Sequence, residues 1–502
     1  MTQIIEISTQ YQLANVAALI RSGRLGGDGN LGEAGRLGDD RQRRILVVAN
    51  NSFAPELTPA ADAMPGSRGL LADFDLVVDW NAAIWPNHPK AFGISGERAP
   101  IMERALRRQW GIDDHEPLEL IVESLPGHPA GALTQIFSTA TISVHSDGLM
   151  SYGPIRNPLT LPQWQRLRTI FYTDLLPGIT PRQLAEHNPD RVVLPTADLA
   201  DVIDAMTAEV ADDLASAGLD SPIGDSALVL GQYLAQLDLI TAEEELELHL
   251  QMIDEVKDAG LSTVIFKPHP TSARTTIGPL RRRCEEFGLD FVLADVPLLA
   301  EIVVAATRPE LVVSCFSTGL ATAKGLYGCH TAAVGTQRLL AELAPYQNSN
   351  RIPLTIIDAL HSGRYELPGR STGTGTGAAA MMATGPKASG ATGSRTSAAT
   401  DGPRDLNGLI DAVTYCMQPD SAAHLRGSAI DFLTSAVGGP EMQYFKRKRL
   451  TALDLPGQEQ PPLHRKTLSV AKRHLISRAK HTQRVLKNYG ITIDASKLRK
   501  NG

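Results

Sequence analysis

Short runs of apolar, β-branched residues alternate along this 502-residue chain with segments that have the spacing of amphipathic helices. This alternation is typical of parallel α/β units, in which each helix returns the chain to the same edge of the sheet. It occurs in two consecutive series of similar size. We therefore expect two Rossmann-like domains facing a central cleft, with ligands beyond the carboxyl ends of the strands.

The hydrophobic patterns predict the following elements. In the first series we expect strands at Ile4–Ile7, Arg44–Val48, Leu76–Val78, Leu118–Val122 and Ala140–Val144, and helices at Leu13–Arg21 and Ala99–Trp110. A long amphipathic helix is expected around Pro195–Gly218. In the second series we expect strands at Ala227–Leu230, Ser262–Phe266, Phe291–Ala294, Leu311–Ser314 and Thr355–Ile357, a helix at Ala242–Ala259, and helical segments from Leu406 to Ala436.

These patterns divide the chain into a first Rossmann-like domain (1–195), an interdomain link (196–224), a second Rossmann-like domain (225–440) and a basic tail (441–502). Within the second domain, residues 371–403 consist mainly of Gly, Ala, Ser and Thr. Such a composition cannot bury enough apolar surface to offset its ordering entropy. We predict a disordered insertion there.

Charge is distributed unevenly. The tail from Glu441 to Gly502 carries 15 Lys and Arg against 4 Asp and Glu, a balance of +11, so that with a net charge of −7 the rest of the chain carries −18. A basic tail on an acidic body suggests contact with an anionic membrane surface, and a solvated, partly helical tail is the alternative. Aromatic residues are not interleaved with the basic ones, so we expect no nucleic-acid partner.

The remaining composition is that of an ordinary globular protein. The four cysteines share no CxxC spacing, which argues against a disulfide framework or a zinc site. No signal peptide and no apolar run of about 18 residues is present. We expect a cytoplasmic protein, with peripheral attachment to the inner face of the cell membrane if the tail binds lipid.

The stretch HSDGLMSYGP follows the last strand predicted in the first series. It places Asp147 just beyond that strand, and Gly148 allows the backbone to approach a ligand closely. A carboxylate there can act as a general base toward an attacking hydroxyl. A plain Asp-Gly turn is the alternative for this stretch taken alone.

The stretch FKPHPTSA follows the strand Ser262–Phe266. Its two prolines hold His269 in an extended loop, where the imidazole could donate a proton or a hydrogen bond to a departing phosphate. Lys267, Thr271 and Ser272 are further donors to anionic oxygens, and the alternative is a structural turn with an exposed histidine. With His269 and Pro270 they form the candidate site residues of this loop.

The stretch SCFSTGLATAKG follows the strand Leu311–Ser314. It brings Ser317, Thr318 and Gly319 to the point where a strand gives way to a helix. Hydroxyls and free backbone N–H groups at a helix N-terminus form a phosphate site. An ordinary N-cap would have the same sequence.

The order of these stretches, an acid-Gly turn followed by His-Pro and then Ser-Thr, resembles the bacterial sialyltransferases and, more closely, the bacterial α-2,8-polysialyltransferase family. The resemblance spans about Ile4 to Leu433, apart from the loop insertions. It implies a glycosyltransferase of the GT-B type, with a CMP-activated sugar as donor and a glycan as acceptor.

The resemblance also implies roles for single residues. Asp147 would deprotonate the acceptor hydroxyl, and His269 would stabilise or protonate the leaving CMP phosphate, which Ser317 and Thr318 would hold. Glu301 stands where related enzymes place a carboxylate that binds the nucleotide ribose, although it could be an ordinary surface residue. Gln232, in LVLGQY, is expected to line the cleft.

One position departs from the family pattern. The first acid of its Asp/Glu-Asp/Glu-Gly motif is Ser146 here, so Asp147 could be displaced or His145 could take part.

The only DxD sequence, Asp73-Phe74-Asp75, leads into the amino end of a strand, the wrong end for a ligand. We expect neither a metal nor another cofactor, and direct attack by the acceptor would invert the anomeric centre.

Three alternatives to transfer of sialic acid remain at this stage. The donor could carry another CMP-linked acid, such as Kdn or Kdo, destined for a cell-wall or capsule polymer. A UDP-sugar epimerase of similar architecture would also use His and carboxylates in its cleft. A non-catalytic binding protein that docks on membranes would explain the missing motif acid.

Overall fold

The computed structural model describes residues 1–25, 42–269, 272, 274–367 and 404–459. Residues 1–445 form one compact unit that contains both large sheets, and a second unit begins at Lys446. In the part of the chain described, no helix combines the length and apolar character needed to cross a membrane.

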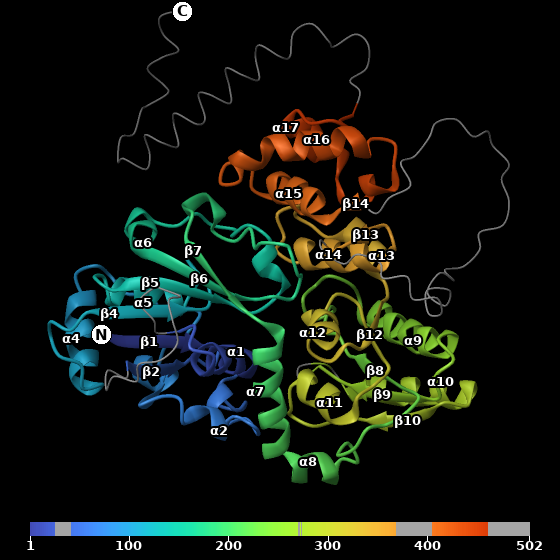
Figure 1. The fold of residues 1–502 in the computed structure, drawn as a ribbon, viewed down its shortest axis with the longest axis horizontal. Coiled ribbons are helices and arrows are strands. Elements are labelled where there is room, and N and C mark those ends of the chain that lie inside the picture. Colours follow the sequence, from blue (N-terminus) through green and yellow to red (C-terminus); the bar gives the residue numbers. More distant parts are fainter. Residues whose placement is uncertain (26–41, 270–271, 273, 368–403, 460–502) are drawn as a thin grey trace, which may run out of the picture. The chain divides into compact units, whose positions relative to one another are not determined.

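The first sheet has seven parallel strands in the order β3-β2-β1-β4-β5-β6-β7 (Figure 1). The strands are β1 (Thr2–Ile7), β2 (Arg43–Val48), β3 (Leu76–Asp79), β4 (Leu118–Val122), β5 (Thr141–Ser146), β6 (Leu167–Thr173) and β7 (Asp190–Leu194). Strand order reverses between β1 and β4, and the crevice beyond the carboxyl ends at such a reversal is the usual ligand position in open α/β sheets.

Helices cover both faces of this sheet, so its central strands are buried on both sides; every residue of β1 is buried. The helices of this half are α1 (Gln10–Arg21), α2 (Arg68–Leu71), α3 (Trp80–Ile84), α4 (Ala99–Gln109), α5 (Ala130–Ile136) and α6 (Leu161–Arg166). One core cluster joins Trp80, Trp110 and Phe137 to the aliphatic residues of β2, β4 and β5.

The second sheet has five parallel strands in the order β10-β9-β8-β11-β12, with its reversal between β8 and β11. Its strands are β8 (Ser226–Leu230), β9 (Thr263–Lys267), β10 (Asp290–Leu293), β11 (Leu311–Ser314) and β12 (His330–Ala333). The helices between them are α9 (Ala242–Asp258), α10 (Ile277–Phe287), α11 (Ala300–Thr307) and α12 (Thr318–Tyr327).

Two helices, α7 (Thr196–Glu209) and α8 (Ala211–Ser216), connect the sheets, and α7 contacts α1 on one side and α11 and α12 on the other (Figure 1). After β12 come α13 (Thr336–Glu342), α14 (Arg351–His361), α15 (Leu406–Met417) and α16 (Arg426–Ala436), with the short pair β13 (Tyr365–Glu366) and β14 (Arg404–Asp405). The described part of the second unit contains α17 (Arg447–Leu453). Short 3-10 helices lie at Ala61–Ala63, Leu149–Tyr152, Ala185–His187, Arg274–Thr276, Ala423–Leu425 and Pro440–Tyr444.

Two parallel sheets confirm the predicted α/β class with two Rossmann-like halves. The strand predicted at Thr355–Ile357 is wrong, because these residues lie in α14, which is buried over nearly its whole length and therefore has the continuous apolar run of a strand. The sequence prediction missed β6, β7 and β12, and the helix expected at Pro195–Gly218 is divided at Val210. The domain boundaries remain a prediction, and the predicted insertion at 371–403 lies outside the described residues.

Candidate functional site

The acid-Gly turn extends from the carboxyl end of β5. Ser146 is the last residue of the strand, and Asp147 and Gly148 follow before the 3-10 helix Leu149–Tyr152 begins. Asp147 is half-buried. Burial raises the pKa of its carboxyl; the charge of His145 and a side-chain hydrogen bond from Gln12 lower it, and the charge of Glu123 raises it further. A raised pKa suits a group that must accept a proton.

The two β5 residues that precede Asp147 form hydrogen bonds within the protein. The Ser146 hydroxyl donates to Oε1 of Gln183 at 2.5 Å. The buried imidazole of His145 has Nε2 2.7 Å from the carbonyl oxygen of Glu6 in β1, while its Nδ1 has no hydrogen-bond partner among the described residues. His145 thus connects β5 to β1 two residues before Asp147.

The His-Pro loop leaves the carboxyl end of β9, where Lys267 is the last strand residue. The ring of His269 stacks on Tyr233 with centroids 3.9 Å apart and planes inclined by 19°. Burial first, and the charge of Lys267 second, lower the pKa of His269 to about 4. At neutral pH its imidazole is therefore uncharged and can donate a hydrogen bond.

Close backbone packing fixes the start of this loop. A Cβ added to Gly231 would lie 3.0 Å from the backbone nitrogen of His269 and from Cα of Pro268. The Ser272 hydroxyl donates to the His269 carbonyl at 2.8 Å, so its predicted contact with phosphate would have to compete with this bond. Pro270 and Thr271 lie outside the described residues.

Gln232 joins two strand ends at the reversal of the second sheet. Its Nε2 donates to Oγ of Ser314, the last residue of β11, at 2.8 Å, and its backbone N–H donates to Nε2 of His249 at 2.8 Å. The side chain is buried. Gln232 therefore holds β8, α9 and β11 together at the position where a ligand is expected.

The Ser-Thr pair begins α12. Ser317 is the N-cap residue, and its Oγ accepts from the Gly319 N–H at 3.1 Å. Thr318 Oγ1 lies 3.5 Å from the backbone nitrogen of Leu149, which donates to it, and a Cβ added to Gly148 would be 3.2 Å from the same oxygen. The structure therefore brings the first and third predicted stretches into contact.

The same helix positions Glu301. The Thr322 hydroxyl, one turn beyond Thr318, donates to Oε1 of Glu301 at 2.7 Å. Glu301 is 8% exposed, so it is not a surface residue. Burial raises the pKa of its carboxyl, and the Thr322 hydrogen bond and the nearby charge of Lys267 partly offset that rise. Lys267 is thus close to both Glu301 and His269, and its Nζ donates to the carbonyl of Val296 at 3.2 Å.

Some residues near this site were not singled out from the sequence. Glu123 directly follows β4, and its Oε2 accepts from Gln12 and Ser8. The Tyr11 hydroxyl is buried without a hydrogen-bond partner among the described residues, and burial and then the charges of Glu301 and Asp147 raise its pKa. The position of Glu123 just after a predicted strand was an available signal; no sequence pattern pointed to Tyr11.

The DxD sequence has structural contacts at the amino end of β3. Asp73 forms an ion pair with Arg21 at 2.8 Å, and Asp75 accepts from the backbone of Arg44 at 2.8 Å. Over the described ranges, no group of three or more His, Cys, Asp or Glu residues is arranged to hold a metal ion. Independence from metal ions and other cofactors remains a prediction.

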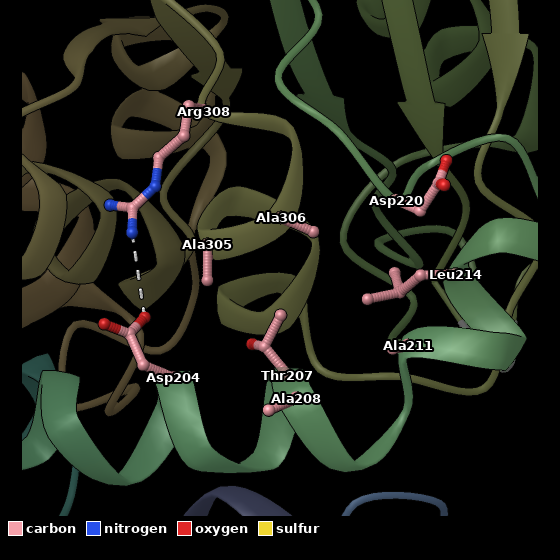
Figure 2. A pocket seen from close by; sticks show the side chains of 9 residues that line it. All are labelled: Asp204, Thr207, Ala208, Ala211, Leu214, Asp220, Ala305, Ala306 and Arg308. Carbon is pink, nitrogen blue, oxygen red and sulfur yellow. Dashed lines mark ion pairs between the residues drawn. The ribbon is translucent and has the colours of Figure 1, made fainter.

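Two cavities differ in their relation to this site. The one in Figure 2, of about 320 Å³, lies among α7, α8 and the carboxyl end of α11, and Arg308 and Asp204 form an ion pair across it at 3.8 Å. None of the predicted site residues lines it. The other, of about 440 Å³, includes Val296, the partner of Lys267. Its remaining lining residues are Pro65, Asp213, Ser216, Ala217, Leu293, Asp295, Pro297 and Leu298.

Comparison with known proteins identifies the family. The family model described as alpha-2,8-polysialyltransferase matches residues 79–336, just over half of the chain, a stretch that includes Asp147, His269, Ser317 and Thr318. No curated protein matches significantly.

Similar solved structures have low sequence identity and TM-scores below 0.5. The GT-B domain of a sialyltransferase from Photobacterium damselae is 13% identical with a TM-score of 0.36, over 71% of this chain and 96% of that one. A glycosyltransferase from Rickettsia africae is 9% identical with a TM-score of 0.35, over 64% and 77%. The UDP-GlcNAc 2-epimerase from Methanocaldococcus jannaschii is 12% identical with a TM-score of 0.33, over 64% and 82%. On the family match, the chain belongs to the alpha-2,8-polysialyltransferase family and is a sialyl-transferring glycosyltransferase.

Proposed function

We propose that this protein transfers sialic acid or a related nonulosonic acid from a CMP-sugar to a glycan acceptor, with inversion and without a metal ion. The observation that carries this proposal is the contact between Thr318 and Leu149. This contact joins the acid-Gly turn, which carries the proposed base, to the N-terminus of α12, which is proposed to hold the phosphate. Such adjacency is what a single displacement at one carbon atom requires.

On the acceptor side, Asp147 takes the proton of the attacking hydroxyl while the acceptor oxygen bonds to the anomeric carbon. The bond from that carbon to the phosphate oxygen breaks, and CMP leaves with the electron pair. Attack by the acceptor from the face opposite the departing phosphate inverts the configuration at the anomeric carbon. The raised pKa of Asp147 strengthens it as a base at neutral pH.

On the donor side, the developing charge is on phosphate oxygens. The uncharged His269 imidazole, the hydroxyls of Ser317 and Thr318 and the first N–H groups of α12 can all donate hydrogen bonds there. A bound phosphate would raise the pKa of His269 by its opposite charge and so favour protonation as CMP departs. Glu301 is held by Thr322 for a contact with the nucleotide ribose.

The basic tail gives a further part of the proposal. Attachment to anionic lipid would keep the enzyme near a membrane-held acceptor, and would make it a peripheral protein of the cytoplasmic face. The segment Arg465–Tyr489 has the composition for this, with Lys and Arg among regularly spaced apolar residues. It lies outside the described residues.

The experiment that tests the proposal is calorimetric titration with CMP, UDP and GDP in the presence of a chelator, followed by a transfer assay with CMP-sialic acid. We expect selective binding of CMP that His269→Ala and Ser317→Ala weaken, and transfer that Asp147→Asn abolishes. Turnover of UDP-GlcNAc without an acceptor would favour the epimerase. Transfer only from CMP-Kdo or CMP-Kdn would change the sugar, and CMP binding without any transfer would favour a binding protein.

A further inference from the structure

The phenol ring of Tyr233 covers one face of the His269 imidazole. The ring centroids are 3.9 Å apart and the ring planes are inclined by 19°, so the two rings are stacked. Tyr233 lies in the loop that follows β8, and His269 lies in the loop that follows the neighbouring strand β9. A stacked imidazole can turn within its own plane but cannot tilt without losing the contact. The stack therefore fixes the plane in which the ring nitrogens of His269 point.

The backbone before Tyr233 is fixed by hydrogen bonds to β9 and α9. The Gly231 N–H donates to the Lys267 carbonyl at 2.8 Å, where the His-Pro loop begins. The Gln232 N–H donates to Nε2 of His249, in α9, at 2.8 Å. These bonds attach the segment before Tyr233 to the same strand end from which the His-Pro loop extends.

The backbone after Tyr233 is fixed by one carboxylate. The N–H groups of Leu234 and Ala235 donate to Oε1 and Oε2 of Glu245, in α9, at 3.0 and 3.1 Å. Glu245 is 8% exposed, and hydrogen bonds to a charged acceptor are stronger than those between neutral groups. Tyr233 is therefore held in place from both sides, and its ring remains half-buried against the imidazole.

We propose that Tyr233 is a positioning residue of the transfer reaction: it holds the imidazole of His269 in the plane from which the ring donates to the departing phosphate, and it shields one face of that ring from water. Tyr233 acts on the reaction through His269, so this inference rests on the proposed function. It also assigns a role to the last residue of the stretch LVLGQY, in which only Gln232 was expected to line the cleft.

Replacing Tyr233 leaves the charged groups near His269 in place. Burial first, and then the charge of Lys267, lower the pKa of His269. Glu301 of α11 is buried close to Lys267, and α9 contributes His249, whose Nε2 already accepts a backbone N–H. A change at Tyr233 therefore alters the burial of the imidazole and leaves these charges as they are.

The first test is an NMR titration of the His269 imidazole between pH 7 and 5, in the full chain labelled with ¹³C-histidine. Its signal is identified by its loss in His269→Ala, and circular dichroism checks the fold at each pH. Tyr233→Ala opens one face of the ring to water, so the midpoint should rise by about one pH unit. About half of the rings should then be protonated at pH 5, against about one in ten in the wild type, in which the pKa of His269 is about 4. An unchanged titration in Tyr233→Ala overturns the proposal.

Two variants serve as controls for the titration. Tyr233→Phe retains the stacked ring and should titrate as the wild type does, which excludes an effect of the phenol hydroxyl. Leu237→Ala changes a side chain of the same loop that is 43% exposed, and it should also leave the titration unchanged. A shift in Leu237→Ala as large as that in Tyr233→Ala would mean that damage to the loop, rather than loss of the stack, moves the midpoint, and it would contradict the proposal.

The second test is the rate of transfer from CMP-sialic acid to a soluble glycan acceptor. Tyr233→Leu keeps an apolar cover on His269 but has no flat ring to hold the plane of the imidazole. We expect kcat to fall about tenfold, because a tilted donor stabilises the leaving phosphate less well, while KM for the acceptor stays the same. Tyr233→Phe should recover kcat. Equal kcat values in the leucine and phenylalanine variants would contradict a role in positioning.

The titration separates this inference from the proposed function, because it requires no substrate. If the midpoint rises in Tyr233→Ala and the protein uses no CMP-sugar, the proposed function fails alone. If the midpoint is unchanged while the wild type transfers sialic acid, the inference about Tyr233 fails and the proposed function stands.

Discussion

Thr318 Oγ1 lies 3.5 Å from the backbone nitrogen of Leu149, although the two residues are 169 positions apart in the chain. Thr318 opens α12 of the second sheet, and Leu149 follows the acid-Gly turn of the first. The contact joins the proposed phosphate site to the proposed base. A change on either side of it should therefore affect transfer more than stability.

Thr318→Val removes the hydroxyl and keeps the shape of the side chain. We expect kcat/KM to fall about tenfold, the cost of roughly one hydrogen bond to a charged group, with little change in melting temperature. Thr207→Val is the matched control, because among the described residues the Thr207 hydroxyl bonds only to the Ile203 carbonyl of its own helix, at 2.8 Å. Equal losses in both variants would show that the Thr318 hydroxyl has no special role.

Gly231→Ala should damage the His-Pro loop. The new Cβ would lie 3.0 Å from the backbone nitrogen of His269 and 3.1 Å from the Lys267 carbonyl, and backbone atoms cannot yield as a side chain can. We expect weaker CMP binding in calorimetry. Gly224→Ala introduces a Cβ with nothing within 4 Å and should bind CMP as the wild type does. Normal CMP binding by Gly231→Ala would mean that the loop does not contact the nucleotide.

Thr322→Val leaves Oε1 of the buried Glu301 without its donor. An unsatisfied buried acceptor costs about 1–3 kcal/mol of unfolding free energy. The affinity for the CMP-sugar should also fall, because Glu301 is no longer held in position. Thr322→Ser retains the hydroxyl and should recover donor affinity. Urea unfolding of the two variants measures the change in stability, and CMP titration measures the change in affinity. If valine and serine behave alike, the 2.7 Å contact does not position Glu301.

His249 should make stability fall in mildly acidic solution. Burial lowers its pKa from 6.5 to about 4, so the folded protein keeps the ring neutral while the unfolded chain protonates it near pH 6.5. The unfolded state therefore binds more protons between those pH values, and the contribution of His249 decreases as the pH falls, by at most about 3 kcal/mol. The neutral Nε2 is also needed to accept from Gln232.

Carboxyls whose pKa values are raised in the folded protein, such as those of Glu6 and Asp147, act in the opposite direction, so the wild-type curve alone is not informative. The measurement is the difference in unfolding free energy between wild type and His249→Gln at pH 7, 6 and 5. As the pH falls, the unfolding free energy of the wild type should decrease relative to that of His249→Gln. A constant difference would contradict a buried neutral imidazole.

Deletion of residues 463–502 should release the protein from anionic vesicles and leave transfer to a soluble acceptor intact. The reason is that 11 of the 15 basic residues between Glu441 and Gly502 lie in the deleted part. Co-sedimentation with vesicles of anionic lipid, compared with neutral vesicles, measures this. Unchanged binding to anionic vesicles would exclude the tail as the membrane contact.

Several elements could be predicted because local patterns sufficed. Leu118–Val122 and Leu311–Ser314 were predicted with the bounds that the structure has, since each is a short, mainly apolar run that contains β-branched residues. The buried run Thr355–Ile357 misled the prediction, because a helix packed on all sides loses the alternation that distinguishes it from a strand. Strands β6 and β7 were missed, since neither followed a recognisable helix–strand rhythm.

By itself the sequence determined the α/β class, the two series of units and the three polar stretches that follow their strands, because strand and helix periodicities and turn residues are local properties. Only the tertiary structure decided that Glu301 is held by Thr322 and that Thr318 meets Leu149. These relations depend on strand order and on the docking of one sheet's helix against the other's loop. Local sequence patterns cannot predict the side-chain environments that such long-range packing creates. For the same reason they cannot predict the pKa shifts that burial causes.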